Sequence, residues 1–329
     1  MNPKGAILVT GGAGYIGSHV AWALLDQKER VIVLDDLSEG SRELAPRTAE
    51  FIEGDVHDEK KVHAIIKEYG VDTVMHFAAF VRVEESVREP AKYEKNNVEG
   101  TKVLLKVAKE SGVEHFIFSG SAAVYGDAEE NPIPESAPMR PLNPYAESKV
   151  RAEEAVMSSG MHAVSLRYFN PAGTDPAGRT GYRTDVAPTH LVRNAVRAAL
   201  RIIPEFTLFG RDYPTPDGTC IRDFIHITDL ADAHLSVLSY LRGGGETRIF
   251  NCGSGRGYSV TEVVRTVKKV SGYDFPVKLE SRRPGDSPAL VADTTRIKRE
   301  LGWKPKRDLE TMVRDELSWV TAHVNTKRV

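Results

Sequence analysis

The chain has 329 residues, of which 41% are hydrophobic and 27% charged, and a formal net charge of -2. This is the composition of a globular protein with enough core for one large or two modest domains. The balance of 44 basic against 46 acidic residues argues against nucleic acid as a partner and against a membrane-attracted surface. We expect neither a signal peptide nor a membrane span. Two cysteines, Cys220 and Cys252, are too few for a disulfide framework, so we expect reduced thiols in a cytoplasmic protein.

Short β-rich runs alternate with helical patterns through the first half of the chain. We expect strands at 6–10, 31–36, 51–56, 71–79, 115–121 and 162–170. A helical pattern at 102–112 ends at Gly112, and another at 144–159 begins with Pro144, which suits a first helical turn. Apolar strands that alternate with helices predict a Rossmann-type doubly wound α/β fold, with a parallel sheet covered on both faces.

The pattern changes after Asn170. Residues 171–185 have the composition of a loop, and 210–220 form a second loop. Helices are expected at 189–201, 225–241, 260–270 and 309–320, with further strands at 207–210 and 248–254. This half predicts a smaller C-terminal substrate-binding α/β region.

A glycine-rich turn follows the first strand. Gly12, Gly14 and Gly17 fit G-x-G-x-x-G, and Gly11 extends the match to a second glycine spacing. Because the turn lies between a strand and a helix, its backbone can approach a pyrophosphate, which the helix N-terminus then attracts. The second strand ends near Asp35, whose carboxylate suits a ribose hydroxyl and repels a 2′-phosphate. The pattern therefore indicates NAD rather than NADP.

A tyrosine and a lysine stand four residues apart in PYAESK. One helical turn places Tyr145 and Lys149 on the same face, where the lysine cation would favour the phenolate. Ser121 ends a strand at the carboxyl edge of the sheet, where open α/β sheets bind ligands. An exposed, unconnected Tyr–Lys pair is the alternative when these two residues are taken alone.

Together these motifs resemble the extended short-chain dehydrogenase/reductase family. GGAGYIGS, the serine of SAAVYG and the spacing YxxxK carry the likeness, which extends over roughly residues 7–303. DGTCIRDFIHITDLADAH and RRPGD are more specific and are similar to the UDP-glucose 4-epimerase family. The resemblance implies an NAD-dependent isomerase that interconverts UDP-galactose and UDP-glucose through a transient 4-keto sugar.

The resemblance also implies roles for individual residues. Tyr145 would take the proton of the sugar 4-OH, Ser121 would hold the same oxygen, and Lys149 would bind the nicotinamide ribose and lower the pKa of the phenol. Cofactor-binding residues would be Gly11, Gly14, Tyr15, Ile16, Gly17, Asp35, Asp36, Asp55, Val56, Phe77, Ala78, Ala79, Asn97, Ser119, Tyr145, Lys149, Tyr168 and Phe169. Substrate-binding residues would be Ser121, Asn170, His190, Leu191, Thr207, Leu208, Phe209, Arg222, Arg283 and Asp286.

Several of these residues have simpler interpretations. Asp55 could only cap a strand end, Asn97 a helix, and Phe77 to Ala79 could be core. For Arg222 alone, a surface ion pair is the default.

On the same basis, we expect residues 1–170 to form an NAD-binding domain to which 221–253 return. Residues 171–220 and 254–329 would form the smaller nucleotide-sugar-binding domain. Family members are commonly homodimers, and the expected interface lies around residues 93–111 and 144–158. No metal is expected, because the ten histidines show no ligand spacing. His226 and His234 are interpreted as packing or capping residues.

Two departures from the family pattern leave the sugar open. Some members carry lysine at the position of Val81 and tyrosine at that of Leu290. The smaller leucine leaves room for an N-acetyl group, so UDP-GlcNAc/UDP-GalNAc is one alternative substrate pair, and UDP-xylose/UDP-arabinose is another. A sugar-nucleotide 4,6-dehydratase needs an acid pair after the catalytic hydroxyl, where this chain has Ala122 and Ala123. A non-catalytic NAD-binding protein would not need an activated phenol.

Overall fold

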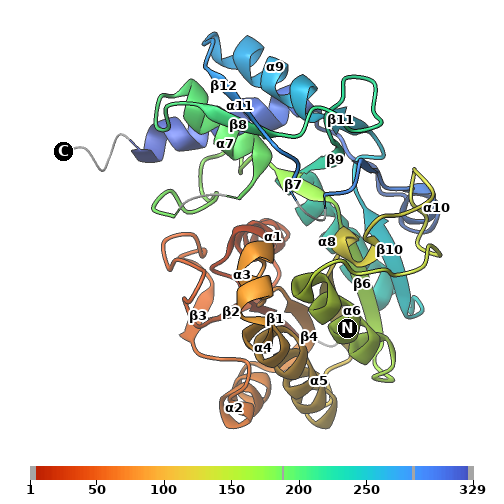
Figure 1. Ribbon diagram of the computed structural model, residues 1–329. Helices are drawn as coiled ribbons and strands as arrows, with labels where there is room; N and C mark the ends of the chain where they lie inside the picture. Colours follow the sequence, from red (N-terminus) through yellow and green to blue (C-terminus); the bar gives the residue numbers. More distant parts are fainter. Residues whose placement is uncertain (1–4, 187–188, 284–285, 325–329) are drawn as a thin grey trace.

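The computed structural model describes residues 5–186, 189–283 and 286–324. A seven-stranded parallel sheet forms its centre, in the order β10-β6-β5-β4-β1-β2-β3 (Figure 1). The strands are β1 (Ala6–Thr10), β2 (Val31–Asp35), β3 (Glu50–Glu53), β4 (Val71–His76), β5 (His115–Ser121), β6 (His162–Tyr168) and β10 (Arg248–Cys252). The first six follow the Rossmann order, so the fold expected from the sequence is confirmed.

Helices cover both faces of this sheet. On one face the buried core joins the strands to α1 (Tyr15–Asp26) and α8 (Ile227–Arg242). On the other face it joins them to α2 (Glu59–Tyr69), α5 (Gly100–Glu110) and α6 (Pro144–Met157). Because both faces are buried, β1 and β2 are buried at every residue, and they appear in the sequence as continuous apolar runs.

The local signals account for the ends of most elements. Pro144 is the first residue of α6, and the Asn143 side chain accepts from the Ala146 amide as its N-cap. Gly112 follows α5 with a φ of 76°, a left-handed conformation that suits glycine. Several expected boundaries were wrong. The third strand ends at Glu53, before Asp55, and residues 225–226 end a strand instead of beginning a helix.

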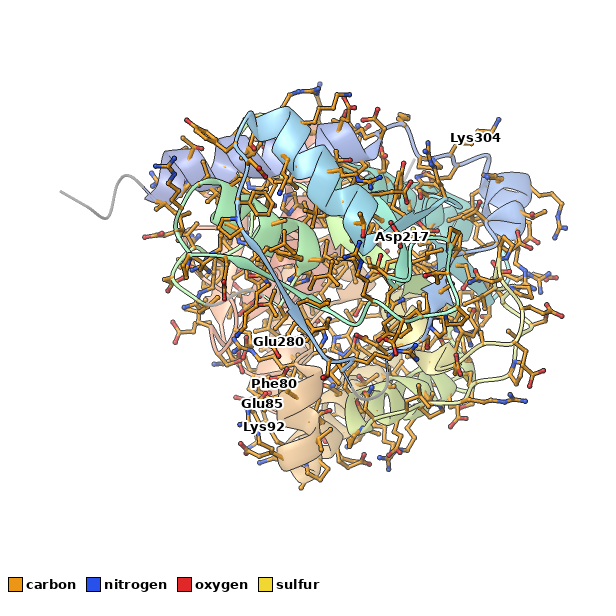
Figure 2. All side chains as sticks on the ribbon, turned by 45° about the horizontal axis from the view of Figure 1, so that its top comes forward. Phe80, Glu85, Lys92, Asp217, Glu280 and Lys304 are labelled. Carbon is orange, nitrogen blue, oxygen red and sulfur yellow. The ribbon has the colours of Figure 1, made fainter. Side chains whose placement is uncertain are left out.

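A second region lies above the carboxyl ends of the central strands (Figure 1). In one small sheet, β9 (Ile221–His226) pairs with β7 (Asn170–Ala172), β11 (Gly257–Ser259) and β13 (Ala289–Leu290). In another, β8 (Phe206–Phe209) pairs with β12 (Val277–Glu280). The helices α7 (Leu191–Ala199), α9 (Val260–Ser271) and α11 (Leu309–Val324) share one core with these strands. Asp217, labelled in Figure 2, accepts from the Ser259 hydroxyl that caps α9.

Short helical elements complete the chain. They are α3 (Val83–Arg88), α4 (Pro90–Tyr93), the π-helical turn η1 (Glu94–Glu99), the 3₁₀ turn η2 (Ala122–Tyr125) and α10 (Thr295–Leu301). Figure 2 shows Phe80, Glu85 and Lys92 together beside α3 and α4. The Lys92 ammonium lies 2.7 Å from Glu85 and 4.3 Å from the centre of the Phe80 ring. These contacts hold α4 against the segment that follows β4.

The cysteines and two of the histidines are buried in the fold. Cys220 and Cys252 are both free and buried. The imidazole of His226 caps α8 by accepting from the Thr228 amide, and His234 is buried in the core, so their interpretation as capping and packing residues is confirmed. Within the described residues, no helix combines the length and apolar character required to cross a membrane. Residues 221–226 belong to the second region, whereas α8 and β10 join the central sheet unit.

Candidate active site

A cavity of about 460 Å³ opens at the carboxyl ends of β1, β4 and β5, between the two regions. We call it the main cavity, and its volume is typical of a small-molecule site. Predicted site residues that line it are Gly11, Gly14, Tyr15, Ile16, Gly17, Phe77, Ala79, Ser119, Ser121, Tyr145, Lys149, Tyr168, Phe169, Asn170, His190, Arg222 and Asp286. A smaller side cavity shares Gly11 and Phe77 with it and is lined by further predicted residues, namely Asp35, Asp36, Asp55, Val56 and Ala78.

The glycine turn is packed too closely for side chains. Gly11 has a φ of 69°, and a Cβ built there would lie 2.5 Å from the Ala78 amide nitrogen. A Cβ on Gly17 would lie 2.2 Å from the Gly11 carbonyl oxygen. Gly14 caps α1 without a side-chain hydrogen bond, so the first-turn amides are not covered by a capping side chain. This turn has the open backbone and the positive helix end that a pyrophosphate requires.

Acidic residues lie at the end of β2 and just after β3, at the edge of the side cavity. The Asp35 carboxylate accepts from the amides of Ala13 and Leu37, at 2.9 Å each. Burial raises the pKa of Asp35, and these two hydrogen bonds oppose the rise. Asp55 accepts from the amide and the ring of His57, in the turn after β3 and not at the strand end that its simpler interpretation assumed. Asp35 and the glycine turn thus fit the adenosine end of a dinucleotide.

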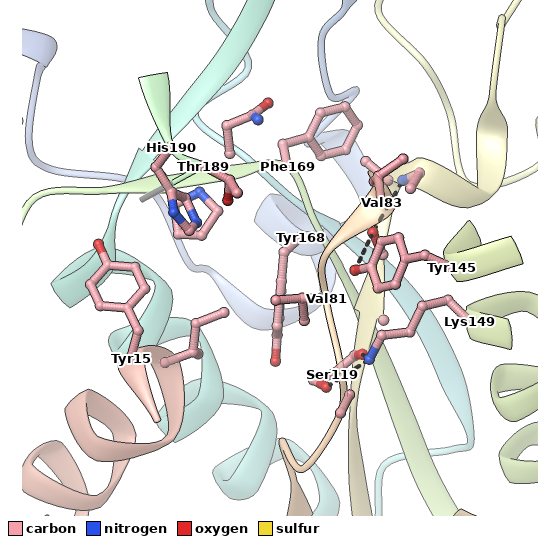
Figure 3. Close-up of a pocket in the computed structure, with 18 of the residues that line it drawn as sticks. Tyr15, Val81, Val83, Ser119, Tyr145, Lys149, Tyr168, Phe169, Thr189 and His190 are labelled. Atoms are coloured by element: carbon pink, nitrogen blue, oxygen red, sulfur yellow. Dashed lines mark hydrogen bonds between the residues drawn. The ribbon is translucent and has the colours of Figure 1, made fainter. Parts of the chain in front are cut away.

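Tyr145 and Ser121 both line the main cavity, and Figure 3 shows the Tyr145 ring there. The phenol oxygen of Tyr145, in the first turn of α6, lies 3.4 Å from the Ser121 hydroxyl at the end of β5. Burial raises the pKa of the Tyr145 phenol, and the hydrogen bond to Ser121 works in the opposite direction. The two hydroxyls are close enough to bind one substrate oxygen together.

Lys149 is buried one helical turn further along α6. Its ammonium donates to the Ser119 carbonyl at 2.9 Å and lies 3.3 Å from the Ser119 hydroxyl (Figure 3). Burial lowers the pKa of Lys149 to about 8, and the negative charge of Glu153 limits the fall. The sequence predicts that the Lys149 cation lowers the pKa of the Tyr145 phenol. Burial of that phenol works against this lowering.

Arg222 and Asp286 line the far end of the main cavity, where the sequence predicts a cationic group for a diphosphate. The Arg222 guanidinium donates to the carbonyls of Ser287 and Ile221, at 2.8 and 2.9 Å, and lies 3.4 Å from Asp286. Arg283 lies 3.3 Å from the other oxygen of Asp286. Both guanidinium groups are paired with carboxylate or carbonyl oxygens, and Arg222 reaches the cavity wall.

Six predicted ligand residues lie outside the linings of both cavities, as far as the described chain shows. They are Asn97, Leu191, Thr207, Leu208, Phe209 and Arg283. Thr207, Leu208 and Phe209 lie in β8, where Arg283 stacks over the Phe209 ring at 4.6 Å. Asn97 is buried, and its amide bonds to the Phe80 backbone instead.

Sequence patterns missed another part of the main cavity. Tyr182 and Arg183 line it from a loop without helical or strand periodicity, and Thr189 lines it just before α7. The Tyr182 ring packs edge-on to Tyr15 and His190, with ring centres 5.5 and 5.1 Å away. Tyr15 and Tyr182 are far apart in the sequence, so no spacing could have indicated the contact between them.

Comparison with known proteins agrees with this geometry. Residues 7–253 match the family described as "NAD dependent epimerase/dehydratase family". The UDP-glucose 4-epimerase of Azospirillum brasilense is 49% identical over 95% of this chain and 91% of its own length.

Two solved structures have the same fold along nearly their whole length. A UDP-glucose-4-epimerase from Stenotrophomonas maltophila, with bound NAD and formylated UDP-arabinopyranose, has a TM-score of 0.95, 35% identity and coverage of 98% of this chain and 100% of its own. The UDP-glucose 4-epimerase from Brucella ovis in complex with NAD has a TM-score of 0.92, 40% identity and coverage of 96% and 98%. The chain belongs to the NAD dependent epimerase/dehydratase family.

Proposed function

We propose that this chain catalyses the NAD-dependent 4-epimerisation that interconverts UDP-galactose and UDP-glucose. The observation that carries the proposal is the pairing of Tyr145 and Ser121 at 3.4 Å, in a cavity that begins at the glycine turn and ends at Arg222. A dinucleotide and a nucleotide sugar would then meet at the phenol. Relatives named UDP-glucose 4-epimerase, 49% and 44% identical to this chain, support the same activity.

Tyr145 is proposed to remove the proton of the sugar 4-OH and to return it after the sugar has turned. Ser121 would hold that oxygen through its hydroxyl and keep it within reach of the phenol. Lys149 would supply a positive charge one helical turn away, which favours the phenolate against the effect of burial.

The cofactor site is proposed to follow the glycine turn and the strand ends. The open turn and the amides at the start of α1 would hold the pyrophosphate, and Asp35 would accept from the adenosine ribose. NAD would supply a hydride acceptor at the sugar C4 that can also give the hydride back. The chain's own residues would hold the proton and orient the sugar. Because the retained cofactor would return the hydride, the reaction would be redox-neutral overall.

The nucleotide end of the substrate is proposed to lie beside Arg222 and Asp286. Guanidinium groups match phosphate oxygens, and the carboxylate of Asp286 would accept from the uridine ribose. This end would anchor the molecule, and the hexose would be free to expose either face. Arg283, Leu191 and β8 lie outside the cavity wall, so any contact they make with the uridine requires an adjustment of the side chains there.

The identity of the hexose is part of the proposal. Val81 and Leu290, the two departures from the family pattern, both line the main cavity. The names of the relatives favour UDP-glucose over the N-acetylated and pentose alternatives, and the match to 4-epimerases disfavours a dehydratase and a non-catalytic protein. We further propose a cytoplasmic homodimer that acts in galactose metabolism and pairs through residues around 93–111 and 144–158.

The test is to assay the purified protein for bound NAD and for turnover of UDP-galactose. The expected result is one NAD per chain, retained through purification, and UDP-glucose as product. A Tyr145→Phe variant should keep the NAD and lose at least about 100-fold in kcat, since it lacks the phenol that moves the proton. Full activity in that variant, or wild-type protein without any epimerisation of UDP-sugars, would refute the proposal.

A further inference from the structure

A line of buried polar side chains runs behind the active site, from β1 to α6. The hydroxyl of Thr10 lies 2.7 Å from His76 Nδ1, and His76 Nε2 lies 2.9 Å from the Thr101 hydroxyl. Thr101 in turn donates to the Asn97 carbonyl at 2.6 Å. Each of these side chains is at most 2% exposed, so every polar group needs a partner inside the protein.

The line continues through the Asn97 side chain. Its Oδ1 accepts from the Phe80 amide at 2.9 Å, and its Nδ2 donates to the Phe80 carbonyl at 3.0 Å. This double contact defines the orientation of the amide, because only Oδ1 can accept from an N–H. The same Nδ2 donates to the Ser148 hydroxyl at 3.0 Å, and that hydroxyl donates to the Tyr145 carbonyl at 2.7 Å.

Hydrogen-bond accounting identifies the tautomer of His76. The single hydroxyl proton of Thr101 goes to the Asn97 carbonyl, which can only accept. His76 Nε2 must therefore carry a proton to bond Thr101, and Nδ1 must accept from Thr10. Burial, with a smaller effect of the Lys149 charge, lowers the pKa of His76 to about 3, so the ring is neutral at ordinary pH.

We propose that His76, as the neutral Nε2–H tautomer, is a positioning residue that ties β1 to the turn of α6 that carries Tyr145. This inference rests on the proposed function, because it concerns the alignment of cofactor and acid–base group. Thr10 directly precedes Gly11 of the glycine turn, and Ser148 holds the backbone of Tyr145. The glycine turn for the cofactor and the helical turn of Tyr145 are therefore joined by one line of hydrogen bonds.

The segment between these ends adds a second point of control. Phe80 follows Phe77 and Ala79, which line the main cavity, and Asn97 holds it at both its amide and its carbonyl. Asn97 lies in η1. Turns of π-helix are rare in proteins, and those that occur are often found at functional sites. A shift of about 1 Å in a reacting group can cost about 100-fold in rate, so a line that aligns both partners has catalytic value beyond stability.

The first test reads the tautomer directly, without activity. Long-range ¹⁵N–¹H spectra of the ¹⁵N-labelled NAD-bound protein report which ring nitrogen of each histidine carries the proton. The His76 signal is identified by its loss in His76→Asn. We expect a protonated Nε2, a bare Nδ1 and no titration from about pH 5 to pH 8. A protonated Nδ1, or titration in that range, would overturn the proposal.

The second test separates positioning from stability. Thr101→Val keeps the side-chain shape but removes the hydroxyl, and we expect kcat to fall about tenfold with KM for UDP-galactose little changed. Thr101→Ser restores the hydroxyl and should restore kcat. The matched control is Thr73→Val on β4, the strand that carries His76, and it removes a buried hydroxyl that donates to Asp72 at 2.7 Å.

The two variants should differ in what they lose. Thr73→Val should lower the melting temperature and leave kcat intact, whereas Thr101→Val should lower kcat even at temperatures well below melting. Wild-type kcat in Thr101→Val, or an equal loss in both variants, would overturn the proposal. If the wild-type protein does not epimerise UDP-galactose, the proposed function fails, while the NMR result still tests the hydrogen-bonded line.

Discussion

Replacing Glu153 by glutamine should destabilise the folded chain by about 3–5 kcal/mol. Glu153, on α6, and Arg167, on β6, form an ion pair whose side chains are only 2% and 3% exposed. The guanidinium donates to both carboxylate oxygens, and Ser165 donates to one of them. Burial disfavours the charged guanidinium, but Glu153 raises the pKa of Arg167 above its ordinary value. Glutamine would keep the shape and leave a buried, uncompensated cation.

The assay is urea unfolding of the NAD-loaded protein, with equal cofactor in every sample. A loss of about 3 kcal/mol corresponds to more than a 100-fold change in the unfolding equilibrium, which linear extrapolation resolves easily. The matched control is Glu59→Gln. Glu59 pairs with Lys106 at 2.9 Å on the surface, where both side chains are about half exposed, so this change should leave stability nearly unaltered.

A double variant tests the physical reason. Glu153→Leu with Arg167→Met removes both charges, and it should recover most of the stability, because the penalty comes from the orphaned charge rather than from the lost attraction. The reasoning would be refuted if Glu153→Gln stayed within about 1 kcal/mol of the parent, or if the double variant were less stable than the single one.

Three further predictions concern the site and its surroundings. Ser121→Ala should lower kcat for UDP-galactose about 10–100-fold, since its hydroxyl is within 3.4 Å of the phenol, and an unchanged kcat would contradict its role. Burial lowers the pKa of Lys149 to about 8, so its cation is present below that pH; kcat should fall as pH rises through about 8, and Lys149→Arg should remove this limb. Burial raises the pKa of Glu316 to about 7 from its ordinary value of 4.5. Between about pH 4.5 and pH 7 the folded state keeps a proton on Glu316 that the unfolded state has lost. The contribution of Glu316 to stability is therefore complete below about pH 4.5 and declines as the pH rises to about 7. Glu316→Gln should flatten that slope in thermal melts across this range.

Local patterns were sufficient for the framework of the fold. The β-rich runs located the strands of the central sheet, and β1 and β2 were the clearest because strands buried on both faces form continuous apolar runs. The glycine spacing located the turn at Gly11, where a side chain would collide with Ala78. The four-residue spacing of Tyr145 and Lys149 placed both on one face of α6. Each of these inferences depends only on neighbours in the sequence.

Long-range contacts decided what the same residues do. The resemblance implied a cofactor-binding role for Asn97, which stays a prediction; the fold shows that Asn97 is buried and that its amide bonds to Phe80 and Ser148. The sequence suggested a more acidic Tyr145, whereas burial raises the pKa of that phenol. It offered no sign of the tautomer of His76, whose two partners are 66 and 25 residues away.

The difference between what the sequence predicted and what the fold decided has one physical cause. Periodicity and glycine spacing are properties of the chain itself, so the sequence alone determined the doubly wound sheet, the glycine turn and the Tyr–Lys face. Burial and hydrogen-bond partners exist only after distant segments pack together, and the free energy of a charge or a proton depends on both. The tertiary structure therefore decided which polar groups face the cavity, which ones hold them in place, and which protonation states they adopt.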